Sequence, residues 1–307
     1  MIQVEGIFTG GGGASPSDKW NDVTFIDYDG SVLYSYSLAE AQALTELPAL
    51  PSHDGLVCQG WNWTLEAIKA LNRPVTVGAM YITDDGTTRL HIRIATIGRM
   101  TVPLYIGQTV ANGVSIDWGD ESAAETLAGT GNVNTSHTYT DPGDYIISLM
   151  PQDGCTLSFS DGSASYCVMG STGNNGEVYC NMLQEFYVGK NVTSIRDYAF
   201  SGCYSLASIT IPDGVTFIGN SAFDSCYSLA SIIIPDGVTS IRDYAFSGCY
   251  GMRYYDFSAC TAIPTLSNTS TFNDIPSDCQ MLIPSALFDE WSAATNWATY
   301  ASCMVAV

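Results

Sequence analysis

Basic residues are scarce in this chain of 307 residues. It holds 10 Lys and Arg against 31 Asp and Glu, which gives a formal net charge of -21 at pH 7. Such a charge repels the phosphate backbone of nucleic acids and the surface of anionic membranes, so we expect neither as a partner. No stretch approaches the ~18 consecutive apolar residues that predict a spanning helix, so we also expect no membrane insertion.

The motifs that usually carry chemistry are missing as well. Only three histidines occur, and the chain contains no G-x-S-x-G, H-E-x-x-H, P-loop or Rossmann pattern. Acidic pairs are plentiful, but nothing singles out one of them as the carboxylate pair of a glycosidase. We therefore expect no catalytic residue, no cofactor and no metal site. The protein is predicted not to be an enzyme, with a carbohydrate-active enzyme as the outlying alternative.

A secretory signal is also absent from the first twenty residues, which have neither the basic nor the apolar region of such a segment. Ile2–Phe8 predict a short strand, and the glycines of Gly10–Gly13 predict a flexible hinge after it. We assign residues 1–19 to this strand and hinge.

What the sequence does contain is repetition. The phrase "AFSGCYSLASITIPDG" begins at Ala199, and related phrases begin at Ala222 and Ala245, so the same interval separates each copy from the next. A unit this short cannot bury its apolar face alone, so the copies are expected to stack into a solenoid. Alternation within "SITIP" places Ile209 and Ile211 inward, and the following Pro-Asp-Gly ends the strand in a turn.

The register extends beyond these three copies. Residues 180–191 predict a half-repeat that begins the stack, and Phe272 takes the Phe position of a last copy after a short insertion. We place the repeats at residues 175–284. Their period and their phrase, I..I...AF..C.SL..I.IP.GV, resemble the BspA-like leucine-rich repeats of bacterial and phage-encoded surface proteins. That resemblance implies adhesion and binding rather than catalysis.

Cysteine recurs on the repeat itself. Four of the ten cysteines, Cys180, Cys203, Cys226 and Cys249, are each one repeat period from the next. Since free cysteine is among the most buried residue types, we favour a role as small core residues, one above another in the stack. Disulfides remain the alternative because the number of cysteines is even, and metal ligation is less favoured because no CxxC or Cys/His spacing occurs. The predicted core of the repeats also includes Phe200, Phe223 and Phe246.

Tyrosine follows the cysteine in three copies and is expected to point away from the core. A second, interrupted row and the last turn add more tyrosines. The candidate ligand-binding residues are therefore Tyr198, Tyr204, Tyr227, Tyr244, Tyr250 and Tyr254. Tyrosine is a rigid, amphipathic contact group that is enriched in recognition surfaces. The alternative is that these rings only pack on one another along the stack.

Residues 88–160 carry a different pattern. Alternating segments separated by Gly and Pro turns predict a β-sandwich. The segments "VSIDWGDESA" and "HTYTDPGDYIISL" resemble a PKD-type immunoglobulin-like domain. The residues that match its motif are Trp118, Gly119, Asp120, His137, Tyr139, Gly143 and Tyr145. We expect His137 to anchor a turn. The carboxylates near Asp120 leave a calcium site open, but a solvated cluster is the favoured interpretation.

Residues 20–87 predict a smaller module. A VTF strand at Val23–Phe25, followed by prolines, a Gly-Trp pair and a closing strand, resembles a Listeria–Bacteroides repeat, which implies a β-grasp-like fold. The sequence also predicts two helical stretches, Leu38–Leu47 and Thr64–Leu71, which is more helix than that family usually contains. Ser37 is a predicted N-cap of the first.

The last segment, residues 285–307, predicts one or two short helices. Phe288, Trp291, Trp297 and Tyr300 follow helical spacing. The end of a solenoid otherwise exposes its core, so we expect these aromatic residues to form a C-terminal helical cap.

Together these segments predict a mainly β, multidomain protein with a β-grasp-like module, a PKD-like β-sandwich and a capped BspA-type solenoid. The modules resemble surface-display parts, yet no export signal precedes them. A bacteriophage virion component, such as a tail fibre, receptor-binding or decoration protein, would reconcile the two, since it is made in a reducing cytoplasm and exposed on the particle. Its expected partners are a bacterial surface glycan or protein, other virion proteins or a second copy of itself. The alternative is a bacterial cell-surface adhesin or a self-assembling extracellular structural protein.

Overall fold

The computed structural model describes residues 22–27, 31–53, 56–61, 63, 65–71, 75–83, 86–95, 100–160, 166–171 and 177–307. The strand and hinge predicted at residues 1–19 lie outside the described residues. The chain divides into two compact units, Met1–Tyr81 and Ile82–Val307, and each is described by itself.

The first unit contains a four-stranded sheet in the order β2-β1-β4-β3. Its strands are β1 (Asp22–Ile26), β2 (Val32–Ser37), β3 (Leu56–Trp61) and β4 (Thr76–Thr83). The helices α1 (Leu38–Gln42) and α2 (Leu65–Lys69) fall within the two predicted helical stretches. Ser37 is the N-cap of α1, as expected: its hydroxyl accepts from the amide of Glu40, whose carboxylate accepts from the amide of Ser37 at 2.9 Å.

The second unit begins with a β-sandwich. Its strands are β5 (Thr88–Ile94), β6 (Thr101–Gln108), β7 (Val114–Asp117), β8 (Glu125–Thr126), β9 (Gly131–Thr138), β10 (Gly143–Pro151) and β11 (Leu157–Phe159). The small sheet has the order β11-β6-β9, while β5, β10, β7 and β8 belong to a larger one. Alternate residues of β5 and β6, such as Leu90 and Leu104, are completely buried between the two sheets.

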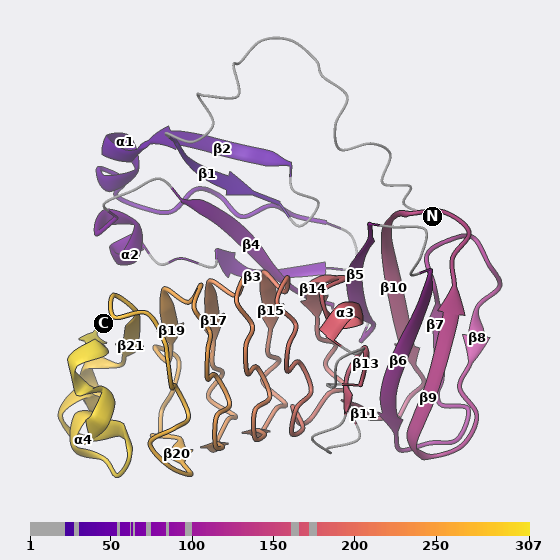
Figure 1. Cartoon of the computed structure of the whole chain (residues 1–307). Helices are drawn as coiled ribbons and strands as arrows, with labels where there is room; N and C mark the ends of the chain where they lie inside the picture. The colour runs from indigo at the N-terminus through magenta and orange to yellow at the C-terminus, as the bar shows by residue number, and fades with distance from the viewer. Residues whose placement is uncertain are drawn as a thin grey trace. The chain divides into compact units, whose positions relative to one another are not determined.

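The repeats follow as a stack of short parallel strands. One series is β14 (Leu183–Tyr187), β15 (Ser208–Thr210), β17 (Ser231–Ile233), β19 (Tyr254–Asp256) and β21 (Gln280–Ile283), which stand side by side in Figure 1. The second is β16 (Phe217–Ile218), β18 (Ser240–Ile241) and β20 (Thr265–Leu266). Ile209 and Ile211 are 3% and 5% exposed, which confirms the inward direction that alternation predicted.

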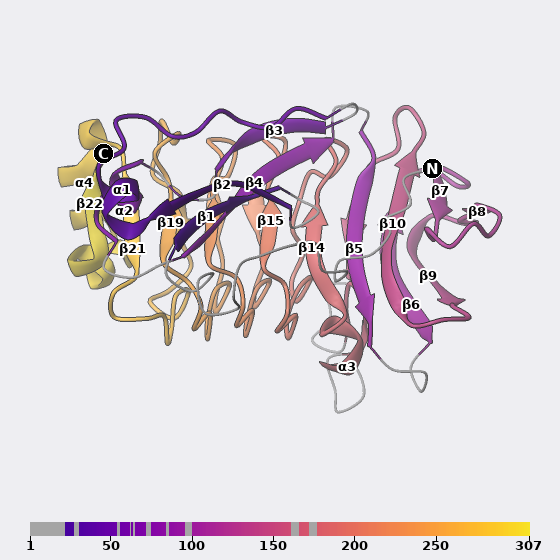
Figure 2. The same ribbon diagram turned by 90° about the horizontal axis from the view of Figure 1, so that it is seen from above.

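The sandwich and the repeats share one sheet. Strand β14 pairs in parallel with β15 on one side and antiparallel with β5 on the other, so the order is β15-β14-β5-β10-β7-β8 (Figure 2). One continuous hydrophobic core runs from Leu90 to Met304. The boundary expected between residues 88–160 and 175–284 therefore passes through a single sheet and a single core. This pairing also satisfies the backbone groups along one edge of the half-repeat.

Between the sandwich and the half-repeat lie a small hairpin, β12 (Tyr166–Cys167) and β13 (Gly170–Ser171), and the helix α3 (Glu177–Cys180). The far end of the stack is closed by η2 (Ser285–Leu287), α4 (Phe288–Ala293) and η3 (Trp297–Cys303). Trp291, Trp297 and Tyr300 are buried there, and Trp297 donates its indole N–H to the carbonyl of Pro264 at 2.7 Å, so the predicted cap is present. A final strand, β22 (Met304–Ala306), pairs in parallel with β21 and was not predicted. Within the described residues, no helix has both the length and the apolar character to cross a membrane.

Candidate functional site

The turn that precedes each repeat cysteine is bonded to the next turn along the stack. Three amides of the first full repeat reach carbonyls of the second: those of Tyr198, Phe200 and Gly202 donate to Asn220, Ala222 and Asp224 at 2.8, 2.7 and 2.9 Å. The second repeat bonds to the third in the same way, for example from Phe223 to Ala245 at 2.7 Å. Equivalent residues of successive turns are therefore superposed, and their side chains form ladders along the stack.

Phenylalanine forms the inner ladder. The rings of Phe200 and Phe223, of Phe223 and Phe246, and of Phe246 and Phe272 stack with centroids 5.2, 5.2 and 5.5 Å apart. All four are buried, which confirms the predicted core positions, and Phe272 occupies the Phe position of the last copy.

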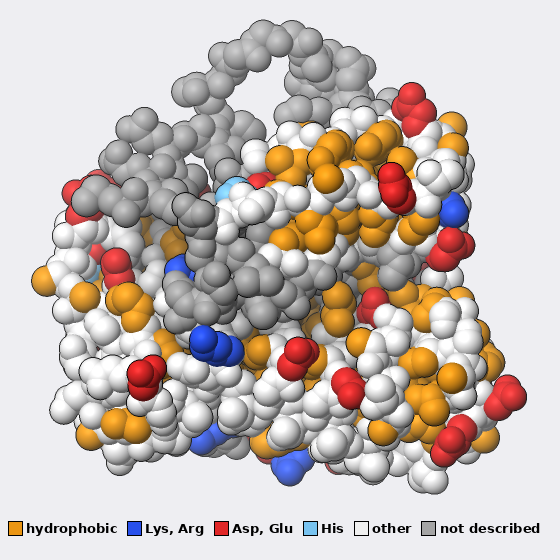
Figure 3. Space-filling model, turned by 180° about the vertical axis from the view of Figure 1, so that it is seen from behind, with side chains coloured by type: hydrophobic (Ala, Val, Ile, Leu, Met, Phe, Trp, Pro, Cys, Tyr) orange, Lys and Arg blue, Asp and Glu red, His pale blue; other side chains and the backbone are white. Residues whose placement is uncertain are grey.

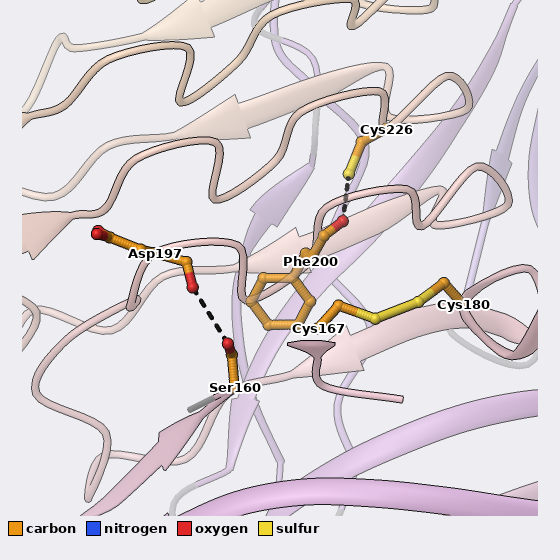
Figure 4. The surroundings of a disulfide bond; sticks show 6 residues. All are labelled: Ser160, Cys167, Cys180, Asp197, Phe200 and Cys226. Carbon is orange, nitrogen blue, oxygen red and sulfur yellow. Dashed lines mark hydrogen bonds between the residues drawn. A yellow bond between two sulfur atoms is a disulfide. The ribbon is translucent and has the colours of Figure 1, made fainter. Parts of the chain in front are cut away.

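Cysteine forms a second inner ladder beside it. Cys180, Cys203, Cys226 and Cys249 are all buried, as predicted. The thiols of Cys226 and Cys249 donate to the carbonyls of Phe200 and Phe223, each at 3.3 Å, and Figure 4 shows the first of these bonds. Burial raises the pKa of Cys249 to about 12, so this thiol stays protonated at neutral pH.

Cys180 departs from the expectation of reduced thiols. It forms a disulfide with Cys167, drawn in Figure 4, so the disulfide alternative is correct for this one repeat cysteine. The reason is local: α3 ends at Cys180, and the hairpin of β12 and β13 brings Cys167 against it. The two are 13 residues apart in sequence, off the repeat period, so the repeat spacing carried no signal for this pair.

Tyrosine forms the outer ladder, which consists of Tyr204, Tyr227 and Tyr250. The rings of Tyr204 and Tyr227 stack with centroids 4.6 Å apart, and those of Tyr227 and Tyr250 with centroids 5.2 Å apart. Tyr227 is 41% and Tyr250 58% exposed, whereas Tyr204 is half-buried. These side chains therefore point outward as predicted, and they also pack on one another.

Stacking determines what the tyrosine ladder offers to a partner. Both faces of the middle ring, Tyr227, are covered by its neighbours, so it presents its edge and its hydroxyl. The ladder ends at Tyr250, because the next copy has Pro276, four residues after Phe272, at the equivalent position. The surface is thus a row of phenol edges that ends in the most exposed ring.

Tyr198 and Tyr244 occupy another equivalent position, with Ser221 between them. All three residues adopt a left-handed backbone conformation, with φ of 60°, 56° and 50°. Tyr244 is 45% exposed and Tyr198 is half-buried. Their row is interrupted by the serine, as expected from the sequence.

A polar network next to this row was not predicted. The carboxylate of Asp197 accepts from the amide and the side chain of Asn220 at 2.7 and 2.8 Å, and it lies 3.9 Å from the guanidinium of Arg242. These residues come from three successive repeats. The signal lay in the sequence, since Asp197 and Asn220 are one repeat period apart, but only the stacked backbone shows that they touch.

Tyr254 is a correction to the candidate set. It lies on strand β19, opposite Ser231 and Gln280 of the neighbouring strands, and not in a turn after a cysteine. It is only 2% exposed. Since it sits on the sheet and is buried, Tyr254 is not part of the exposed surface that the tyrosine ladder forms.

The shared sheet carries a second unpredicted cluster. His91 on β5 lies 3.0 Å from the carboxylate of Asp144 on β10 and 3.6 Å from that of Glu185 on β14. Burial alone would lower the pKa of His91, but its contacts with Glu185 and Asp144 outweigh burial and raise it. The imidazole thus links the sandwich to the first strand of the repeats.

His137 has the structural role that the sequence indicated. Its ring stacks on Trp118 with centroids 5.0 Å apart, and Nε2 lies 2.6 Å from the carboxylate of Asp120. Asp120 also accepts from the amide of Ser122 at 3.2 Å, and Asp117 accepts from that of Gly119 at 2.9 Å. These carboxylates therefore bind donors of their own turn.

Comparison with known proteins bears on the repeats. Residues 174–279 match the family model of the BspA type leucine rich repeat region, in six copies, close to the predicted range. A leucine-rich repeat protein from Bacteroides ovatus is similar to 57% of this chain over 43% of its own, with 21% identity and a TM-score of 0.31. A leucine rich cell surface protein from Faecalibacterium prausnitzii is similar to 36% of this chain over 57% of its own, with 19% identity and a TM-score of 0.18. This chain thus spans less than two thirds of either protein, and no curated protein matches it. The resemblances to PKD domains and to the Listeria–Bacteroides repeat stay predictions.

Proposed function

We propose that this protein is a non-enzymatic adhesin that acts outside the cell, at a bacterial surface, and binds its partner through the repeats. Two observations support this. Residues 174–279 are repeats of the BspA type, whose resemblance to surface proteins implies adhesion and binding. The Cys167–Cys180 disulfide suits an oxidising, extracellular setting better than a reducing cytoplasm.

The observation that carries the proposal is the tyrosine ladder. Three consecutive repeats present a tyrosine at the same position, and the exposure of Tyr227 and Tyr250 leaves about half of each side chain in water. A row needed only for stability would be better buried, as the Phe ladder of the same repeats is. Rigid aromatic groups that lose little conformational entropy on contact are suited to binding.

The chemistry of the ladder limits the partner. Edge-on rings offer ring edges and phenolic O–H groups, which both donate and accept hydrogen bonds, so the partner must supply hydrogen-bonding groups along the direction of the stack. Protein carbonyls and glycan hydroxyls both qualify, and the proposed partner is a surface protein or glycan. On the face drawn in Figure 3, acidic side chains are spread out and mark no single patch.

The surface adhesin takes the place of the virion component expected from the sequence. The match to BspA-type repeats supports a surface role. Fractionation of the producing bacterium separates the two. We expect the protein on the envelope of cells that release no phage, and recovery only in purified phage particles would overturn the surface assignment.

The binding role is tested on intact bacterial cells. Labelled full-length protein is compared with the triple variant Tyr204→Ala, Tyr227→Ala, Tyr250→Ala, which we expect to lose most of the bound signal. A matched control is Thr193→Ala, Thr216→Ala, Thr239→Ala, three exposed residues with the same spacing elsewhere on the repeats. Cells treated with protease or with periodate show whether the partner is a protein or a glycan. Equal binding by wild type and the tyrosine variant would contradict the proposal.

A further inference from the structure

The inner ladder of thiols is interrupted at its first full repeat. Cys226 and Cys249 each donate to the carbonyl of the phenylalanine one repeat earlier. Cys203 occupies the same position, but the segment before it is α3 and not a repeat turn, so no phenylalanine precedes it at that spacing. In the described part of the chain its thiol makes no bond of this kind.

What Cys203 meets instead is a pair of sulfur atoms. The Sγ atoms of Cys167, Cys180 and Cys203 all lie within 4.8 Å of one another. The three residues come from β12, the end of α3 and the first full repeat, and each is at most 1% exposed. A free thiol is thus held against a disulfide in the core. Figure 4 draws this disulfide together with Phe200.

We propose that these three residues form an exchangeable disulfide site, in which Cys180 pairs with either Cys167 or Cys203. In the exchange, the Cys203 thiolate attacks Sγ of Cys180, the Cys180–Cys203 bond forms and the Cys167–Cys180 bond breaks. Cys167 leaves as a thiolate and takes up the proton that Cys203 lost. The number of disulfides does not change, so no oxidant or reductant is consumed.

The second pairing is sterically reasonable. The Sγ atoms of Cys180 and Cys203 already lie within 4.8 Å of each other. The two residues are also one repeat period apart, which is the offset at which β14 and β15 pair in parallel, for example Phe186 with Ile209.

The two pairings tie different segments together. The Cys167–Cys180 bond holds the hairpin of β12 and β13 against α3, whereas a Cys180–Cys203 bond would join α3 to the first full repeat and release Cys167. Exchange would thus change which neighbour of α3 is covalently fixed, at the junction between the sandwich and the repeats. The inference does not depend on the proposed adhesin function.

Burial governs how readily the exchange occurs. It raises the pKa of Cys203, and among the described residues no charged group contributes to that shift. The thiol of Cys226 in the next repeat interacts with Cys203, is also buried and has a raised pKa. The attacking thiolate is therefore rare at neutral pH, and exchange should accelerate as pH rises.

The first test uses the variant Cys167→Ser in the full chain, equilibrated in a glutathione redox buffer, quenched in acid, alkylated and digested without reduction. Mass spectrometry should find most of Cys180 linked to Cys203. In the control Cys203→Ser, Cys167–Cys180 should be the link of Cys180, and Cys226 should stay unlinked in both variants. An alkylated, unlinked Cys180 in folded Cys167→Ser would overturn the proposal.

A second test needs no substitution. Oxidised wild-type protein is incubated at increasing pH without added thiol, quenched in acid, denatured and alkylated. After the same short incubation at each pH, more label should have moved from Cys203 to Cys167 at the higher pH, whereas a label on Cys203 and never on Cys167 would overturn the proposal.

A soft metal ion bound by all three thiolates is the competing interpretation. If the reduced protein binds Cd²⁺ with a thiolate charge-transfer band that each Cys→Ser change removes, and Cys180–Cys203 never forms, the site is a metal site instead.

Discussion

The inner phenylalanine ladder and the outer tyrosine ladder follow the same period, but they differ in what surrounds them. Both consist of stacked rings about one strand spacing apart, at centroid distances of 5.2 Å for Phe200 and Phe223 and 4.6 Å for Tyr204 and Tyr227. The phenylalanine rings are completely buried, while Tyr250 is 58% exposed. The comparison shows that stacking alone does not reveal a structural role. Burial decides how much each ladder contributes to stability and what remains available to a partner.

The largest expected effect is on the inner ladder. Phe223→Ala removes a ring that stacks on Phe200 and Phe246, and the cavity cannot collapse because the backbones of both neighbouring repeats are hydrogen-bonded in place. We expect a loss of about 3–5 kcal/mol in the free energy of unfolding, measured by chemical denaturation. A loss below about 1 kcal/mol would show that the inner ladder is not the core of the stack.

The cysteine ladder should come next. Cys226→Ser shortens a completely buried side chain and exchanges sulfur for a more polar oxygen, so we expect a loss of about 1–3 kcal/mol. Cys226→Ala serves as the matched control, because it also removes the thiol bond to Phe200 without burying a hydroxyl. Unchanged stability in both variants would mean that this position tolerates loss of packing and that Cys226 is not part of the core.

The outer ladder should matter less for stability. Tyr227→Ala removes two stacking contacts at a position that is already 41% exposed, so we expect a loss of about 0.5–1.5 kcal/mol. Tyr227→Phe, which keeps the ring, should restore most of that stability. A loss as large as that of Phe223→Ala would abolish the distinction between the two ladders.

The smallest effect concerns Asp224, which lies between Phe223 and Cys226. Burial raises its pKa above the ordinary 3.8. Hydrogen bonds with the hydroxyls of Ser247 and Ser225 lower the pKa, but burial outweighs them. Because the folded pKa is the higher one, the contribution of Asp224 to stability is fully present below pH 3.8 and is lost as the pH rises through the folded pKa. Asp224→Asn should therefore gain stability relative to wild type at neutral pH.

The measurement is a series of melting temperatures from pH 3 to pH 7 for wild type and Asp224→Asn. We expect the difference between them to widen with pH, in favour of the variant. A difference that is constant over this range would show that the carboxyl group is not desolvated in the turn.

The repeats could be predicted because every copy has the same sequence pattern. Period, alternation and the Pro-Asp-Gly turn sufficed to place Ile209 in the core and Tyr227 on the surface, and the BspA-type match extends over the same residues. Where two positions alternate, however, a residue that points away from the core need not be exposed. Tyr254 was expected in the last turn with the exposed tyrosines, yet it lies on strand β19 next to the core residue Tyr255 and is buried.

No pattern in the sequence predicted the contacts between distant segments. The pairing of β5 with β14 joins residues far apart in the chain, such as Leu90 and Phe186, and neither segment repeats the other. The same holds for His91 with its two carboxylates and for Cys167 with Cys180. Backbone pairing and side-chain contacts of this kind depend on the assembled sheet, whereas the helical cap could be predicted because an open solenoid end requires one.

The most direct test of the account compares binding and stability in one variant, Tyr204→Ala, Tyr227→Ala, Tyr250→Ala. Its binding to intact bacterial cells and its melting temperature are measured beside those of wild type. We predict that cell binding is lost while the melting temperature falls by less than it does in Phe223→Ala. Retained binding, or a collapse in melting temperature like that of Phe223→Ala, would contradict the claim that the tyrosine ladder serves recognition.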